Sequence, residues 1–129
     1  MPGKSLPRPT DAELEILNVL WKRGPSTVRE VHDALLESKE IGYTTILKLM
    51  QIMAEKGLVK RDESDRRHVY EAERAQDETQ RQLLHDLLDR AFNGSATKLV
   101  MQALSSKKAS KEELAEIRRV LDELERGKK

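Results

Sequence analysis

Residues 42–70 constrain the fold of this chain more than any other segment. An apolar stripe at helical spacing runs from Ile46 to Met53, and Gly57 follows where a helix would end in the left-handed conformation. Two short runs, residues 58–61 and 66–70, then flank a polar turn and predict a basic β-hairpin. A helix over residues 43–56 that leads into a hairpin is the second half of a winged helix.

Two capping boxes mark the helices that would complete this fold. Thr10 and Glu13 open a helix over residues 11–23, and Thr27 and Glu30 open another over residues 27–38. Three short helices followed by a hairpin predict a winged helix-turn-helix DNA-binding domain over residues 10–75, preceded by a flexible arm over residues 1–9. The residues expected to face its core are Leu14, Leu17, Leu20, Trp21, Val28, Val31, Leu35, Ile46, Leu49, Met50 and Met53.

The rest of the chain, residues 76–129, is predicted to be helical with breaks at Asn93-Gly94 and near residues 105–109. A third capping box, Ser110 to Glu113, opens the last helix. About 50 residues cannot build a compact core alone, so we expect these helices to pair with a second copy of the chain. The fold class is thus mainly α with a small β-hairpin wing, followed by C-terminal dimerisation helices. The residues expected in the dimer are Leu84, Leu87, Leu88, Leu99, Val100, Leu104, Leu114, Ile117, Leu121 and Leu124.

Composition excludes several classes of function. The chain has no cysteine, and its three histidines, His32, His68 and His85, fall on separate predicted elements, so we expect no metal and no cofactor. It has no glycine-rich phosphate loop and no Gly-x-Ser-x-Gly motif, so we expect no enzyme. The N-terminus lacks an apolar signal region, and no apolar run approaches the ~20 residues that span a bilayer. A cytoplasmic protein without membrane insertion is expected.

The polar face of the helix over residues 43–56 has the side chains that the DNA major groove requires. Thr44, Lys48 and Gln51 lie opposite the apolar stripe, with no acid before Glu55. Lysine can bond guanine, glutamine can bond adenine, and threonine offers a hydroxyl and a methyl. Because the net charge is only +1, the basic groups must be segregated locally. We predict base reading by Thr44, Thr45, Lys48 and Gln51, and backbone contacts from Tyr43, Lys60, Arg66, Arg67, Lys4 and Arg8.

The residues alone leave alternatives open. The face with Lys48 could be an ordinary solvated surface, Thr45 could cap its helix, and Leu47 could either line the core or contact a thymine methyl. Arg66 and Arg67 could pair with acids of the hairpin turn, although exposed pairs contribute only ~0–1 kcal/mol. The alternative function is a protein-interaction winged-helix module with no sequence-specific DNA binding.

The chain resembles the penicillinase repressor (BlaI/MecI/CopY) family of winged-helix transcriptional regulators over nearly its whole length from residue 10. The segments that carry the resemblance are residues 11–21, 43–46, 55–59, 110–114 and 117–121. The resemblance implies a bacterial homodimeric repressor that binds inverted-repeat operators. It also implies that the C-terminal helices form the dimer and that an event that disrupts this dimer releases the DNA.

Three departures from the family affect what is expected. In some members a membrane sensor-protease triggers cleavage at an Asn-Phe bond in the dimer region. Gln102 and Ala103 occupy that place here, which argues against signalling by the same protease. The absence of cysteine excludes copper sensing by a cysteine cluster. Leu47 and Ile52 stand in the helix where members often have arginine, so a different operator preference is expected.

Overall fold

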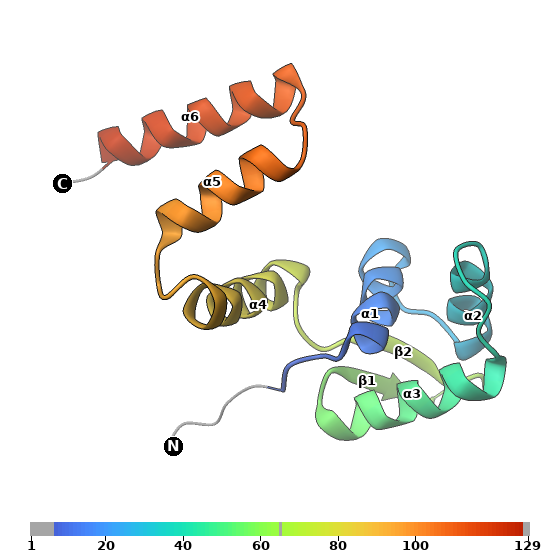
Figure 1. Cartoon of the computed structure of the whole chain (residues 1–129). Helices are drawn as coiled ribbons and strands as arrows, with labels where there is room; N and C mark the ends of the chain where they lie inside the picture. The colour runs from blue at the N-terminus through green and yellow to red at the C-terminus, as the bar shows by residue number, and fades with distance from the viewer. Residues whose placement is uncertain (1–6, 65, 128–129) are drawn as a thin grey trace. The chain divides into compact units, whose positions relative to one another are not determined.

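The computed structural model describes residues 7–64 and 66–127, and it confirms the predicted fold class. The chain divides into two compact units, of which the first ends at Leu84 and the second begins at His85. This division falls inside a helix, and the domain boundary expected between residues 75 and 76 stays a prediction. The elements in chain order are α1 (Asp11–Arg23), α2 (Val28–Leu36), α3 (Tyr43–Lys56), β1 (Val59–Asp62), β2 (Val69–Ala72), α4 (Gln76–Ala91), α5 (Ala96–Ser106) and α6 (Lys111–Gly127) (Figure 1).

Both predicted capping boxes of the first unit are confirmed. The Glu13 amide donates to the Thr10 hydroxyl at 3.2 Å, and the Thr10 amide donates to the Glu13 carboxylate at 2.9 Å. Thr27 and Glu30 repeat this arrangement at the start of α2. Because the caps satisfy amides that have no partner inside the helix, they fix where α1 and α2 begin. Gly57 ends α3 with a φ of 84°, the left-handed conformation that glycine adopts without strain.

The wing differs from the prediction in its second strand. The register pairs Val59 with Ala72 and Asp62 with Val69, so β2 begins three residues later than the predicted run over residues 66–70. Arg66 and Arg67 therefore lie in the turn and not in a strand, and His68, with a φ of 51°, ends that turn. The strand continues to Ala72, and it includes Tyr70, whose side chain is buried in the core.

Ser26, between α1 and α2, forms an isolated antiparallel bridge with Tyr70 of β2. The Ser26 amide donates to the Tyr70 carbonyl at 2.9 Å, and the Tyr70 amide donates to the Ser26 carbonyl at 2.8 Å. Tyr70 is thus hydrogen-bonded through its backbone to Ser26 and lies opposite Arg61 of β1 in the register. A one-residue strand has no periodicity, so the sequence pattern gave no sign of it.

The core of the first unit joins all three helices to the wing. Three predicted core positions are only half-buried: Leu14, Leu49 and Trp21, whose indole N–H donates to the Arg74 carbonyl at 3.0 Å. Pro9 is buried, so this end of the predicted arm packs on the unit, whereas residues 1–6 lie outside the described residues. The buried apolar residues are Ile16, Leu17, Leu20, Val28, Val31, Leu35, Ile46, Met50, Met53, Leu58, Val59 and Tyr70.

A buried ion pair connects the start of α1 to the end of α3. The Glu13 side chain is only 3% exposed, and its two carboxylate oxygens accept from the Lys56 ammonium at 2.8 and 3.0 Å. Burial raises the pKa of Glu13, but the hydrogen bonds from Lys56 and Thr10 outweigh it, so this pKa lies below its ordinary value. One carboxylate thereby caps α1 and holds the last residue of α3.

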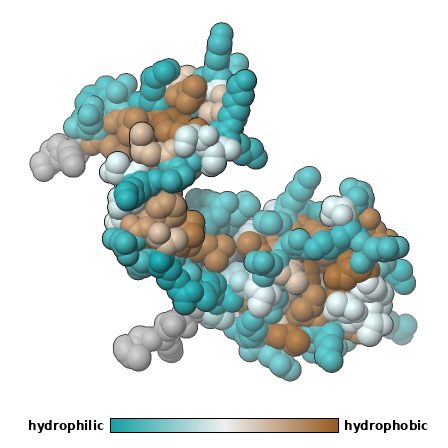
Figure 2. Space-filling view, viewed as in Figure 1, coloured by the Kyte–Doolittle hydropathy of each residue, from teal (hydrophilic) through white to brown (hydrophobic). Residues whose placement is uncertain are grey.

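The second unit shows the predicted breaks and caps but buries little. Asn93 and Gly94 have φ values of 50° and 79° and separate α4 from α5, and Ser110 and Glu113 form the third capping box. In α5 and α6, all of whose residues are described, no side chain is buried. Leu121 and Leu124 are 55% and 63% exposed, and Figure 2 shows apolar surface over these helices. Among the described residues, no helix has both the length and the apolar character needed to cross a bilayer.

We predict that Lys56→Met destabilises the first unit and changes its response to acid. Removing one partner of a buried pair typically costs 3–5 kcal/mol, but Lys56 is 33% exposed, so we expect a loss of about 1–3 kcal/mol at pH 7. In the wild type, the lowered pKa of Glu13 gives stability that is present above pH ~4.3 and is lost as the pH falls through the folded pKa. In the variant, the lowering by Lys56 is lost while burial still raises the pKa of Glu13, so this contribution becomes smaller.

Urea unfolding between pH 3 and 7 measures both effects. Lys22→Met is the matched control, because Lys22 is an exposed lysine in the last turn of α1. Equal midpoints and equal pH profiles for the two variants would show that the pair contributes nothing.

Candidate nucleic-acid interface

Helix α3 projects the predicted base-reading residues away from the core. Ile46, Met50 and Met53 are buried on its inner side. Thr44, Thr45, Lys48 and Gln51 are all exposed. The helix begins after Gly42 without a side-chain cap, so the alternative in which Thr45 caps it is not observed. Leu47 is half-buried and packs against the core, as the alternative in which it lines the core predicts.

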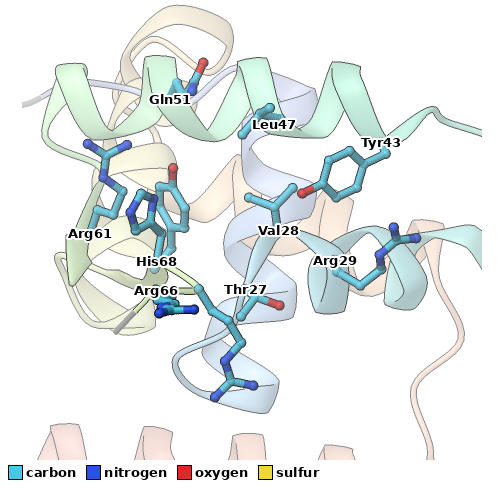
Figure 3. A pocket seen from close by; sticks show the side chains of 11 residues that line it. Thr27, Val28, Arg29, Tyr43, Leu47, Gln51, Arg61, Arg66 and His68 are labelled. Atoms are coloured by element: carbon cyan, nitrogen blue, oxygen red, sulfur yellow. The ribbon is translucent and has the colours of Figure 1, made fainter. Parts of the chain in front are cut away.

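A hollow of about 400 Å³ lies between α3, the start of α2 and the wing (Figure 3). Four arginines line it, from α2, β1 and the turn of the wing, and none of its described lining residues is an acid. Guanidinium groups bind phosphate oxygens through two parallel hydrogen bonds, so this hollow suits a polyanion. Its lining residues are Thr27, Val28, Arg29, Tyr43, Leu47, Gln51, Arg61, Arg66, Arg67, His68 and Tyr70.

The Tyr43 ring is held between two side chains of α2. The Arg29 guanidinium lies 5.0 Å from the centre of the ring, and the His32 ring meets it edge-on at 6.0 Å. The Tyr43 side chain points into the hollow, toward Val28 (Figure 3). A cation–π contact at an exposed site contributes ~0.5–1 kcal/mol, which is enough to bias the direction of Arg29. This contact links Arg29 of α2 to Tyr43 at the start of α3, and both residues line the hollow.

Arg61 lies on β1 of the wing. It is opposite Tyr70 in the register and forms an ion pair with the Glu63 carboxylate. The nearby Tyr70 and Glu63 side chains raise the pKa of Arg61. The neighbouring acid, Asp62, accepts from the Ser64 amide at 2.9 Å and from its hydroxyl at 2.7 Å, and these bonds lower the pKa of Asp62. The acids at the start of the turn therefore shape the turn and engage Arg61.

The structure brings only part of the predicted contact set together. Arg66, Arg67 and Tyr43 line the hollow, whereas Lys60 is exposed on β1 outside it. Arg8 is exposed near the start of α1, and Lys4 lies outside the described residues. Among the described residues there is no group of three or more histidine or acidic side chains that could hold a metal ion.

Sequence reasoning missed Arg29 and Arg61, which line the same hollow. The alternation of side chains along a strand could have indicated the position of Arg61. It lies on the same face of the hairpin as the buried Tyr70, its cross-strand partner. Arg29 carried a weaker signal: it follows the Thr27 cap, in the first turn of a helix whose buried residues are Val28, Val31 and Leu35.

Three helices, a hairpin wing, an exposed acid-poor α3 and an arginine-lined hollow define the first unit as a winged helix with a basic face. The family model described as "Penicillinase repressor" matches residues 9–123, and the chain belongs to this family.

Two relatives match nearly the whole chain. It is 34% identical over 123 residues to the transcriptional regulator BlaI of Mycobacterium tuberculosis (strain H37Rv), covering 95% of this chain and 88% of that protein. It is 28% identical to the penicillinase repressor of Bacillus licheniformis, covering 98% of each. A solution structure of Bacillus licheniformis BlaI, in its monomeric form in complex with the blaP half-operator, has a TM-score of 0.50 at 27% identity. This match covers 58% of the present chain and 92% of that one.

Proposed function

We propose that this chain is a bacterial transcriptional repressor that acts in the cytoplasm as a homodimer and binds inverted-repeat operator DNA through its winged helix. The observation that carries the proposal is the hollow beside α3, which four arginines line and in which none of the described lining residues is an acid. Membership of the penicillinase repressor family supports the function, as does the relative solved on a half-operator.

In this proposal the exposed face of α3 enters the major groove. Thr44, Lys48 and Gln51 then contact base edges, and Thr45 contacts the edge of the same site. Arg66, Arg67 and Tyr43 contact phosphates, with Lys60, Arg8 and Lys4 adding positive charge. Phosphate contacts fix the position of the protein on the duplex, whereas the base contacts supply the sequence preference.

Two copies of the chain are needed because one winged helix covers one half-site. The apolar side chains left uncovered on α5 and α6 support a dimer through this unit, with α4 contributing Leu84, Leu87 and Leu88. Pairing would place two α3 helices in major grooves about 34–36 Å apart on one face of the duplex. Linking two weak half-site contacts raises the effective concentration of the second contact.

Release follows from the same arrangement, because any event that separates the dimer leaves two weakly bound monomers. Gln102 and Ala103, the residues at the place of the family's cleavage bond, are exposed within α5. A protease needs the chain in an extended form, so cleavage there by a sensor-protease would require this helix to unwind locally.

We predict that Lys48→Ala weakens operator binding by about 1–3 kcal/mol and weakens binding to random DNA less, because a base contact carries sequence information. Fluorescence anisotropy with fragments of the upstream region of the protein's own gene, across a salt series and with random competitor, measures both affinities. Lys22→Ala is the control, since Lys22 is an exposed lysine in α1.

An equal loss on both DNAs would make Lys48 a phosphate contact. Wild-type binding that is weak, insensitive to salt and equal for all sequences would instead favour the protein-interaction module.

We predict that Leu121→Asp gives a monomer with at least tenfold weaker operator binding, because it places a charge in the apolar stripe of α6. Analytical ultracentrifugation reports the oligomeric state, and anisotropy reports the affinity. Ala115→Asp adds the same charge on a different side of α6 and should leave the dimer intact. Tight dimeric binding by Leu121→Asp would place the dimer surface elsewhere.

A further inference from the structure

Arg61 borders two hollows of opposite character. On one side is the basic hollow lined by Arg29, Arg66 and Arg67. On the other is a hollow of about 430 Å³ whose lining includes Glu55 and Glu63. Among the described residues, only Arg61 and Gln51 line both. The guanidinium of Arg61 therefore lies on the boundary between an arginine-rich surface and an acidic one.

We propose that, in the DNA-free protein, the Glu63 carboxylate occupies the position on Arg61 that a DNA phosphate takes in the complex. On binding, Arg61 exchanges this carboxylate for a phosphodiester of the duplex. The proposal rests on the DNA-binding function proposed above. It adds Arg61 as a backbone contact that the sequence did not reveal, and Glu63 as the acid that opposes this contact.

The geometry keeps Arg61 in place while leaving its partner replaceable. Arg61 lies on β1 opposite Tyr70, which is 1% exposed, so the strand pairing fixes where the Arg61 side chain begins. The side chains of Arg61 and Glu63 are 35% and 53% exposed, so the ion pair can be reached from solvent. Glu63 lies just beyond β1, and its side chain can turn away without breaking a bond between the strands.

Carboxylate and phosphate compete for the same donors. A guanidinium presents its N–H groups in a planar fork that matches either anion, so one arginine cannot serve both fully. A duplex that contacts the basic hollow would bring a phosphate toward Arg61 and toward Arg29, which also lines this hollow. Glu63 would then lie close to a second negative charge and would have to leave.

The exchange lowers the affinity for all DNA and not for one sequence, because phosphate contacts carry no sequence information. Glu63→Gln keeps the length of the side chain and its hydrogen-bonding capacity but removes the charge that competes with phosphate. An exposed ion pair is weak, so we expect Glu63→Gln to bind both operator and random DNA about three- to tenfold more tightly per dimer.

The experiment compares wild type, Glu63→Gln and Glu37→Gln by fluorescence anisotropy on a 30-base-pair operator duplex and on random DNA of the same length. Glu37 is an exposed acid at the end of α2 that lines neither of the two hollows, so its variant reports the general effect of removing one negative charge. Thermal unfolding of each variant checks the fold. A gain for Glu63→Gln well above that of Glu37→Gln, equal on both DNAs, supports the exchange.

A second comparison ties the effect to Arg61. Arg61→Gln should weaken binding to both DNAs, and Glu63→Gln should give no further gain in that background. If Glu63→Gln matches Glu37→Gln, or still tightens binding without Arg61, the exchange is overturned while DNA binding stands. If the wild type binds neither DNA, the proposed function itself fails.

Discussion

Tyr70 lies where the helices, the hairpin and the basic hollow of the winged helix meet. The chain contains one Trp, two Tyr and one Phe, all described, and among them only Tyr70 is buried. Its backbone bonds to Ser26, and its register partner is Arg61. Its side chain belongs to the core and also lines the basic hollow. The position of the wing beside α3, and with it the arginine-lined hollow, depends on this one side chain.

The helices of the first unit were predictable from sequence because their signals are local. The bounds of α1 and α3 agree with the expectation, since a capping box and a glycine stop act within a few residues of the helix ends. α2 ends two residues earlier than expected, at Leu36, where the amides of Ser38 and Lys39 both bond the Leu35 carbonyl. Capping side chains marked the starts of α1 and α2 in the sequence, whereas no such signal marked the end of α2.

The wing and the hollow were less predictable because their signals are not local. Within β2, Tyr70 is buried and pairs with Ser26, which lies 44 residues earlier in the sequence. The ion pair of Glu13 and Lys56 likewise joins residues that no periodicity connects. Arg29 and Arg61 reach the same space from α2 and β1, so only the tertiary arrangement shows that they belong with Arg66 and Arg67.

The ion pair between Glu13 and Lys56 also limits how this protein could be redesigned. An engineer who wanted a new operator preference would exchange the exposed residues of α3 for those of another repressor. Lys56 is the last residue of that helix, and its partner belongs to α1. A transplanted helix that ended in a residue without a positive charge would leave the Glu13 carboxylate buried without a cation. The exchangeable part of α3 therefore ends at Glu55, and a cation must be retained at position 56 as part of the scaffold.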